Sequence, residues 1–232
     1  NGIMISMSKT LHIIGDSFCC DFDWWTTFKD DKNTIDPTEE YNNSHQWINI
    51  VKNNLGFDEV KNHSQAGCSM YYHSVKLNEL IRNNEIKKDD KVIIGLSSIG
   101  RIQHPYKLKT GNVLNLPDIK ALIDFKSVDN IETIHWWGVE MNAWFPIVLY
   151  QILTFYKINF CFSAFLYTNQ DSHFSKTLKN HPINDLTFGL TKETDLRNYI
   201  SSVEENYFPT HLDKEDNKKL GKDLTKFLEK IW

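Results

Sequence analysis

The sequence lacks the features that identify several classes of protein. It contains no dense run of Lys and Arg, and 26 basic residues against 30 acidic ones give a formal net charge of −4. Such a chain offers no basic surface to neutralise a row of phosphates, so we expect no nucleic-acid partner. Nothing near the first residue has the basic stretch and apolar run of a secretory signal. We therefore expect a cytoplasmic location and no membrane partner.

Cysteine is scarce and is not arranged for metal binding. The four cysteines, Cys19, Cys20, Cys68 and Cys161, have no Cys-x-x-Cys or Cys/His spacing that would assemble a tetrahedral zinc site. We expect reduced thiols, with Cys19 and Cys20 acting as packed small side chains. Asp16 has no second carboxylate or His near it in the sequence. The sequence thus predicts no metal and no cofactor.

What the sequence does contain is enough apolar material for one core. Its 232 residues are 41% apolar and 24% charged, close to the averages of globular proteins. A chain of this length buries a continuous core. We expect a single domain over residues 7–232, with residues 1–6 as a leader or an added remnant before a second plausible start at Met7. The oligomeric state is left open.

Apolar runs of strand length alternate with amphipathic stretches of helix length. The strands are expected at Thr10–Gly15, Val60–His63, Lys91–Leu96 and Ile158–Phe165. The helices are expected from a Ser44 cap to Gly56, from Ser69 to about Arg82, within Trp136–Tyr156, and over Asp213–Ile231. Residues 169–205 are polar and are expected to hold short helical fragments. Because strands that alternate with helices form a parallel sheet covered on both sides, the predicted fold class is α/β, a three-layer α/β/α fold with a mostly parallel central sheet and a flavodoxin-like outline.

Three of the predicted strands end in turns with candidate functional residues. Ser17, Gly67 and Ser97 each lie just past a strand. Open α/β sheets bind their ligands beyond the carboxyl ends of the strands. We therefore expect these three segments to meet at one edge of the sheet.

A Gly-Asp-Ser turn after the first strand carries a candidate nucleophile, Ser17. A serine hydroxyl attacks poorly at neutral pH unless a base takes its proton and donors stabilise the oxyanion. Gly67 has no Cβ, so its N–H can approach a reacting carbonyl closely. Both motifs also have a purely structural reading, because turn-forming Gly-Asp-Ser sequences and loop glycines occur in many folds.

Taken together, the motifs resemble those of the SGNH (GDSL-like) hydrolase family over nearly the whole chain. They follow the family's order: Gly15-Asp16-Ser17, Gly67, Gly95-Leu96-Ser97-Ser98, and His211 before the last helix. The resemblance implies an α/β/α fold, Ser17 as the nucleophile and His211 as the general base. It further implies that Gly67 and Ser97 share the oxyanion, and we count Asp16 among the oxyanion or binding residues.

Two positions depart from the family pattern. Where the family has Gly-x-Asn-Asp, this chain has Ser97, whose hydroxyl donates one hydrogen bond but is shorter than an Asn side chain. Where the family has Asp-x-x-His, the position three residues before His211 is Phe208. The carboxylate that would orient the base is therefore missing from its usual place. A backbone carbonyl, Asp213 or Glu205 is the alternative partner in a Ser–His dyad or rebuilt triad.

Arg101 and the other histidines need separate interpretation. The run from Ser97 to Arg101 resembles a variant third motif of SGNH-like proteins from large phages. Arg101 is either a binding residue for an anionic or sugar group or a surface salt-bridge residue. His181, followed by Pro182, competes for the role of base. We prefer His211 because a terminal amphipathic helix follows it directly.

Aromatic residues gather before and within the fourth helical stretch, at Trp136, Trp137, Trp144 and Phe145. Flat indole faces suit a wall that binds sugar or acyl groups. Packing in the core under a long helix is the interpretation we prefer.

The functional prediction is a serine ester hydrolase of the esterase or acetylesterase type. Its expected partner is a small-molecule or carbohydrate ester, with a short acyl group as the preferred class. One alternative is a lipase or thioesterase that acts on longer acyl chains. The other is a catalytically silent binding module, which Phe208 and Ser97 favour.

Overall fold

The structure is a computed structural model that describes residues 9–16, 19, 46–65, 68–96, 144–164, 181–190 and 214–232. Its strands are β1 (Thr10–Ile14), β2 (Glu59–Asn62), β3 (Lys91–Gly95), β4 (Asn159–Ser163) and β5 (Thr187–Phe188). Its helices are α2 (Trp47–Leu55), α3 (Met70–Arg82), a helix over residues 144–155, the 3₁₀ helix η3 (Pro182–Leu186) and α7 (Lys214–Ile231).

The five strands form one sheet in the order β2-β1-β3-β4-β5, and every neighbouring pair is parallel. In the centre, Ile13 of β1 lies opposite Ile93 of β3, which lies opposite Cys161 of β4. This is the strand order of flavodoxin-like folds, whose ligands bind where the order reverses, between the first and third strands. The predicted parallel sheet and flavodoxin-like outline are confirmed.

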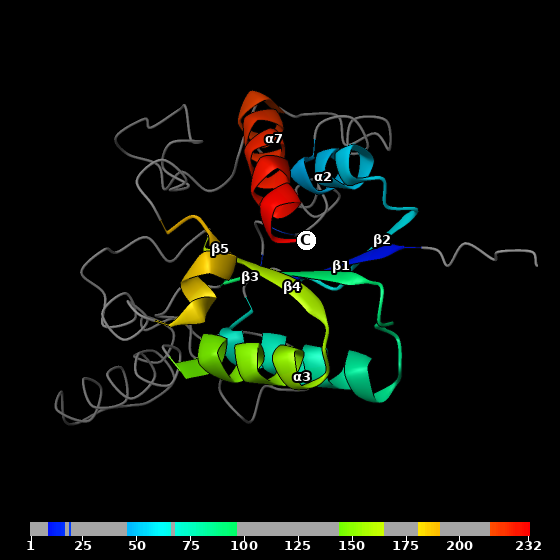
Figure 1. The fold of residues 1–232 in the computed structure, drawn as a ribbon, viewed down its shortest axis with the longest axis vertical. Helices are drawn as coiled ribbons and strands as arrows, with labels where there is room; N and C mark the ends of the chain where they lie inside the picture. The colour runs from blue at the N-terminus through cyan, green and yellow to red at the C-terminus, as the bar shows by residue number, and fades with distance from the viewer. Residues whose placement is uncertain are drawn as a thin grey trace, which may run out of the picture.

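Helices cover both faces of the sheet (Figure 1). Successive residues of a strand point to opposite faces. Leu11, Ile13 and Ile93 belong to the apolar cluster that includes α2 and α7. Ile14 and Ile94 belong to the cluster that includes α3 and the helix over 144–155. Two apolar layers on one sheet make a three-layer α/β/α architecture, as the sequence predicts.

Two expected elements differ from the structure. The cap expected at Ser44 is wrong, since α2 begins at Trp47 with Gln46 at the N-cap position, although it ends before Gly56 as predicted. No strand was expected within residues 169–205, yet β5 lies there beside β4. A strand of two residues is too short to produce a visible periodic pattern. The helix expected after Ser69 is confirmed as α3.

Helices α2 and α7 lie side by side and run in the same direction. Three contacts in the same order along both helices show this. The Trp47 N–H donates to Asn217 Oδ1 at 3.4 Å, Ile50 packs on Gly221, and Asn54 Nδ2 donates to Thr225 Oγ1 at 3.3 Å. The apolar stripe of α7, Leu220, Leu224 and Leu228, is fully buried against the sheet.

The direction of α7 follows from contacts at the amino edge of the sheet. Trp232, just after α7, donates from Nε1 to the carbonyl of Phe160 at 3.4 Å, and Lys91 Nζ lies 5.6 Å from the centroid of its ring. Phe160 and Lys91 are at the starts of β4 and β3. Because the last turn of α7 lies at the amino edge, its first turn, from Lys214, is directed toward the carboxyl edge.

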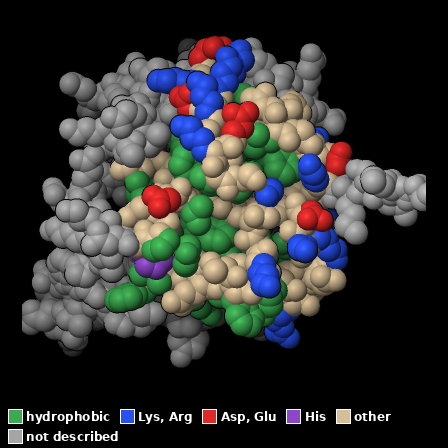
Figure 2. Space-filling model, viewed as in Figure 1, with side chains coloured by type: hydrophobic (Ala, Val, Ile, Leu, Met, Phe, Trp, Pro, Cys, Tyr) green, Lys and Arg blue, Asp and Glu red, His purple; other side chains and the backbone are tan. Residues whose placement is uncertain are grey.

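The surface differs between the two helical layers. Figure 2 shows Lys, Arg, Asp and Glu side chains gathered over α7 at the top of the view and more hydrophobic side chains lower down. Large exposed apolar residues lie on α3 and on or just after the helix over 144–155: Tyr71, Val75, Trp144, Val148, Phe155 and Tyr156. Among the described residues, no helix combines the length and apolar character that crossing a membrane requires.

The close packing of α2 on α7 predicts that Gly221→Ala destabilises the protein. A Cβ at Gly221 would lie 2.8 Å from Ile50 Cβ, so overpacking costing about 1–3 kcal/mol outweighs the gain of about 1 kcal/mol in helix propensity. Urea unfolding measures the difference. Lys222→Ala, at an exposed neighbouring position of the same helix, is the control and should change stability little. A more stable Gly221→Ala protein would contradict this packing.

Candidate active site

The described residues on either side of Ser17 form a tight turn at the carboxyl end of β1. The Cys19 N–H donates to the Asp16 carbonyl oxygen at 2.9 Å, a bond that spans three residues. Asp16 is 1% exposed and Cys19 is fully buried. Ser17 stands between them in the sequence and lies outside the described residues. A short turn directly after a buried strand, as the sequence predicts, is therefore present in its flanking residues.

The segment after β2 is bound to the same turn. The Gln65 N–H donates to the Gly15 carbonyl at 3.0 Å, and Cys68 Sγ donates to the same oxygen at 3.2 Å. Asn62 Nδ2 donates to the Cys19 carbonyl at 2.7 Å. Gly67 lies outside the described residues, but Gln65 and Cys68 on either side of it are both bonded to the residue before Asp16.

The end of β3 lies beside the end of β1. A Cβ built on Gly15 would lie 3.5 Å from the Gly95 Cα. Leu96, the residue before Ser97, donates its N–H to the Ser163 carbonyl at 2.8 Å. Ser97 and Arg101 lie outside the described residues. The flanks of the first and third motifs are therefore neighbours on the carboxyl edge.

His211 lies outside the described residues, three positions before Lys214, where α7 begins. The first turn of α7 is directed toward the carboxyl edge, as the contacts of Trp232 establish. Buried polar residues gather where α2 and α7 begin: Gln46, Asp216 and Asn217. Of the six site residues that the sequence predicts, Asp16 is the one that the structure describes, and the five others, Ser17, Gly67, Ser97, Arg101 and His211, stay predictions.

Cys19 fills the space beside Gly15, so only a residue without a Cβ fits at this position. A Cβ on Gly15 would lie 2.7 Å from Cys19 Cβ and would also contact Cys19 Sγ. Real Cβ atoms do not approach that closely, so the turn after β1 requires glycine at this position. The interpretation of Cys19 as a packed small side chain is consistent with this contact. Burial raises the pKa of the Cys161 thiol well above its ordinary value, so that thiol stays protonated.

Two buried clusters were missed by sequence analysis because their members are far apart in the chain or are single polar residues among apolar ones. In the first, Cys68 Sγ lies 3.1 Å from His73 Nε2 on α3, and both residues are fully buried. Since the thiol donates to Gly15, the imidazole Nε2–H donates to the sulfur. This pair ties the start of α3 to the segment that contains Gly67.

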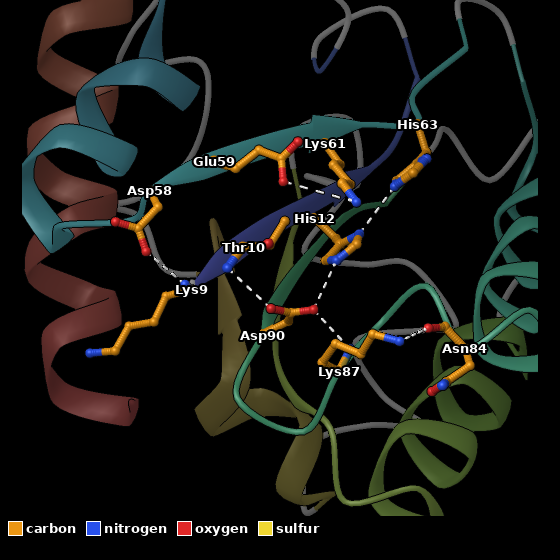
Figure 3. Close-up of polar contacts among 10 residues, drawn as sticks. All are labelled: Lys9, Thr10, His12, Asp58, Glu59, Lys61, His63, Asn84, Lys87 and Asp90. Atoms are coloured by element: carbon orange, nitrogen blue, oxygen red, sulfur yellow. Dashed lines mark hydrogen bonds and ion pairs between the residues drawn. The ribbon is translucent and has the colours of Figure 1, made fainter. Parts of the chain in front are cut away.

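The second cluster is a row of His63, His12 and Asp90 on the α3 face of the sheet (Figure 3). His12 Nδ1 lies 3.1 Å from His63 Nε2, and His12 Nε2 lies 3.3 Å from Asp90 Oδ2. The two imidazole rings are nearly coplanar, with an interplanar angle of 8°. His12 is a single polar residue in the apolar run of β1, and its partners are 51 and 78 residues away in the chain. The sequence therefore gives no signal that these residues meet.

Both histidines are held neutral. Burial, together with smaller effects of the neighbouring His12, Lys76 and Lys61, lowers the pKa of His63 to about 4. Burial also lowers the pKa of His12, against the opposing effect of its hydrogen bond to Asp90. The contact between His12 and Asp90 is therefore a hydrogen bond from a neutral ring rather than an ion pair.

Other sequence candidates have structural roles. His181 Nδ1 accepts a hydrogen bond from the Ile183 N–H at 3.2 Å and caps η3, which agrees with our preference for another base. Phe145 packs against the core as expected. The expectation of core packing is wrong for Trp144, which is 52% exposed. The residues that the structure describes hold no group of three or more potential metal ligands.

The fold and the carboxyl-edge contacts define a doubly wound α/β protein in which three motif flanks meet at one edge of a parallel sheet. No family model and no curated protein matches the chain. Among solved structures it is similar to the psychrotrophic esterase EstA from Pseudoalteromonas sp., inhibited by monoethylphosphonate, at 12% identity, with 96% of this chain and 98% of that chain covered and a TM-score of 0.48.

Two further structures give similar values. TesA is 14% identical, with 97% of this chain and 100% of that chain covered and a TM-score of 0.49. A carbohydrate esterase, whose active site is described as having divergent catalytic and non-catalytic binding functions, is 13% identical, with 96% of this chain and 65% of that chain covered and a TM-score of 0.47. At such values the fold assignment rests on the strand order and layers of the chain itself.

The contact between Gly15 and Cys19 predicts that Gly15→Ala lowers the free energy of unfolding by about 1–3 kcal/mol through overpacking. Cys19→Gly removes both contacting atoms, so the double variant should recover part of the loss. A double-mutant cycle in urea, with Cys19→Gly alone as the reference, measures the coupling. Equal losses with and without Cys19 would show that the two residues do not compete for space.

Proposed function

We propose that the chain is a serine ester hydrolase in which Ser17 is the nucleophile and His211 the general base. The observation that carries the proposal is the joining of motif flanks at the carboxyl edge. Gln65 and Cys68 bond to Gly15, and Gly95 lies directly beside it. These contacts support a site at the β1/β3 reversal, where doubly wound folds bind ligands.

The proposed reaction has two steps. Ser17 Oγ bonds to the ester carbonyl carbon while its proton moves to His211, and the Gly67 N–H and the Ser97 hydroxyl stabilise the oxyanion. The bond to the alcohol breaks as His211 returns the proton to the leaving oxygen. Water then gives a proton to His211 as its oxygen bonds to the acyl carbon, and the acyl bond to Ser17 Oγ breaks as His211 returns that proton to Oγ, which releases the acid and restores Ser17. A small-molecule or carbohydrate ester with a short acyl group is the proposed substrate class, with Arg101 as a binding residue.

A catalytically silent binding module is the second candidate. Phe208 stands where an orienting carboxylate is expected, and Ser97 stands where a longer amide donor is expected. A site without both groups keeps the pocket but lowers catalytic power. This candidate predicts that the protein binds an ester without cleaving it. A lipase or thioesterase stays the alternative within the enzyme class, and activity against esters of increasing acyl length separates it from an acetylesterase.

Labelling by a fluorophosphonate probe tests the nucleophile. We expect the native protein to be labelled, because the probe reacts with a serine that a base has activated. Ser17→Ala should abolish labelling. Ser74→Ala, which removes a serine hydroxyl bonded to a backbone carbonyl on α3, is the matched control and should be labelled normally. Absence of labelling in the native protein would favour the silent binding module.

The oxyanion role of Ser97 is tested by comparing two neighbouring serines. Ser97→Ala should lower kcat for a nitrophenyl acetate by about 10²–10³ with little change in KM, the usual effect of removing an oxyanion donor. Ser97→Asn should keep or raise activity if there is room for the amide. Ser98→Ala is expected to be active, because alternation turns it away. The reverse pattern would shift the assignment by one residue.

A further inference from the structure

We propose that Asp90, His12 and His63 form a hydrogen-bonded relay that fixes His63 with an unprotonated Nδ1 and makes it a positioning residue for the segment that contains Gly67. The first part of this inference stands on geometry alone. The second part rests on the proposed function, because Gly67 is assigned there as an oxyanion donor.

Asp90 fixes the direction of the relay. Its Oδ1 accepts from the Thr10 N–H at 3.1 Å, and its Oδ2 accepts from the Lys87 N–H at 2.7 Å (Figure 3). These two backbone donors hold the carboxylate beneath β1, and its 3% exposure keeps it from water. A carboxylate can only accept, so the proton of the His12 contact lies on His12 Nε2.

The tautomer of His12 then determines the tautomer of His63. A neutral imidazole with a proton on Nε2 has an unprotonated Nδ1, and that atom faces His63 Nε2 at 3.1 Å. Only one proton can lie between the two nitrogens, so it lies on His63 Nε2. The Nδ1 of His63 is left as an acceptor. The order is carboxylate, imidazole, imidazole, and the end with the unprotonated nitrogen is the half-buried ring after β2.

His63 is also the first residue of the segment that holds Gly67. Its N–H donates to the Ile13 carbonyl at 2.8 Å, and Gln65, two residues on, bonds to Gly15. The hydrogen bond to His12 holds the His63 side chain on the α3 face of the sheet. The backbone hydrogen bonds to Ile13 and Gly15 hold the same segment against β1. Together they fix the segment at the carboxyl edge where the proposed oxyanion forms.

Burial disfavours a positive charge on His63, so protonation of its ring destabilises the folded segment. Lys61 of β2 and Lys76 of α3 face the ring, and the charges that oppose them are Glu85 and, through His12, Asp90 and Glu59. In the unfolded chain the pKa of His63 is 6.5, and in the folded chain burial lowers it to about 4. The unfolded state therefore binds more protons between these values. Stability from the neutral ring is full above about pH 6.5 and is lost as the pH falls toward about 4.

The test of the relay is nitrogen NMR of the imidazole rings in the whole protein at neutral pH, which separates protonated from unprotonated ring nitrogens. We expect protonated Nε2 and unprotonated Nδ1 in both His12 and His63, with the His63 signals identified by their loss in His63→Gln. Asp90→Ala removes the acceptor of the His12 Nε2 proton and should let both rings populate the tautomer with a proton on Nδ1. Asp89→Ala, at the exposed neighbouring position, is the control and should leave both tautomers unchanged.

A native protein with a proton on His63 Nδ1 would overturn the relay, as would an Asp90→Ala protein with unchanged tautomers. If Asp90→Ala fails to fold, the tautomers of the native protein decide the question. None of these outcomes depends on esterase activity, so the relay and the proposed function fail separately.

The positioning role is tested by hydrogen exchange of the Gln65 and Cys68 amides, corrected for intrinsic rates, from pH 7 to pH 4. In the native protein we expect protection to fall about tenfold or more over this range. In His63→Gln, whose amide can still donate to His12, protection should stay constant within about twofold, and kcat/KM should lose its corresponding acidic step. Identical pH profiles in the two proteins would show that His63 does not position the segment.

Discussion

The close approach of three chain segments around Gly15 is the constraint on which the rest of the carboxyl edge depends. Its carbonyl accepts from the Gln65 N–H and from Cys68 Sγ, and its missing Cβ leaves room for Cys19. A single residue thus joins the turn after β1 to the segment after β2. Because Gly95 lies alongside, β3 ends at the same place. Any side chain at this position would separate segments that the proposed chemistry needs together.

The two faces of the sheet differ in the polar side chains that they bury. The α2 and α7 face is filled by apolar side chains, and the parallel packing of these helices directs the start of α7 toward the carboxyl edge. The α3 face contains the same kind of core but also the row of Asp90, His12 and His63. Buried polar groups of this kind persist only when each has a partner. At one end of the row, the Thr10 and Lys87 N–H groups donate hydrogen bonds to Asp90. At the other end, the His63 ring is half-buried, so water can reach it.

Most of the architecture was predictable from local pattern. The strands around Ile13, Ile93 and Cys161 are continuous apolar runs because both faces of a parallel sheet are covered, and such runs are visible in a single sequence. The apolar stripe of α7 was visible because its leucines recur with the period of a helix. The two-residue β5 and the start of α2 were not, because a strand that short has no period and because cap position depends on what the helix packs against. Trp144 was misassigned since an aromatic residue at a helix start looks the same whether a second layer covers it or not.

The candidate site divides in the same way. The sequence by itself determined the order of the Gly-Asp-Ser turn, the later glycine and the strand-end serines, because each follows a strand and strand ends of a parallel sheet share an edge. Only the tertiary structure decided that Gly15 is the common acceptor and that His12 meets partners 51 and 78 residues away. Hydrogen bonds between distant residues leave no periodic trace in a sequence, because their geometry exists only after β1 is paired with both β2 and β3.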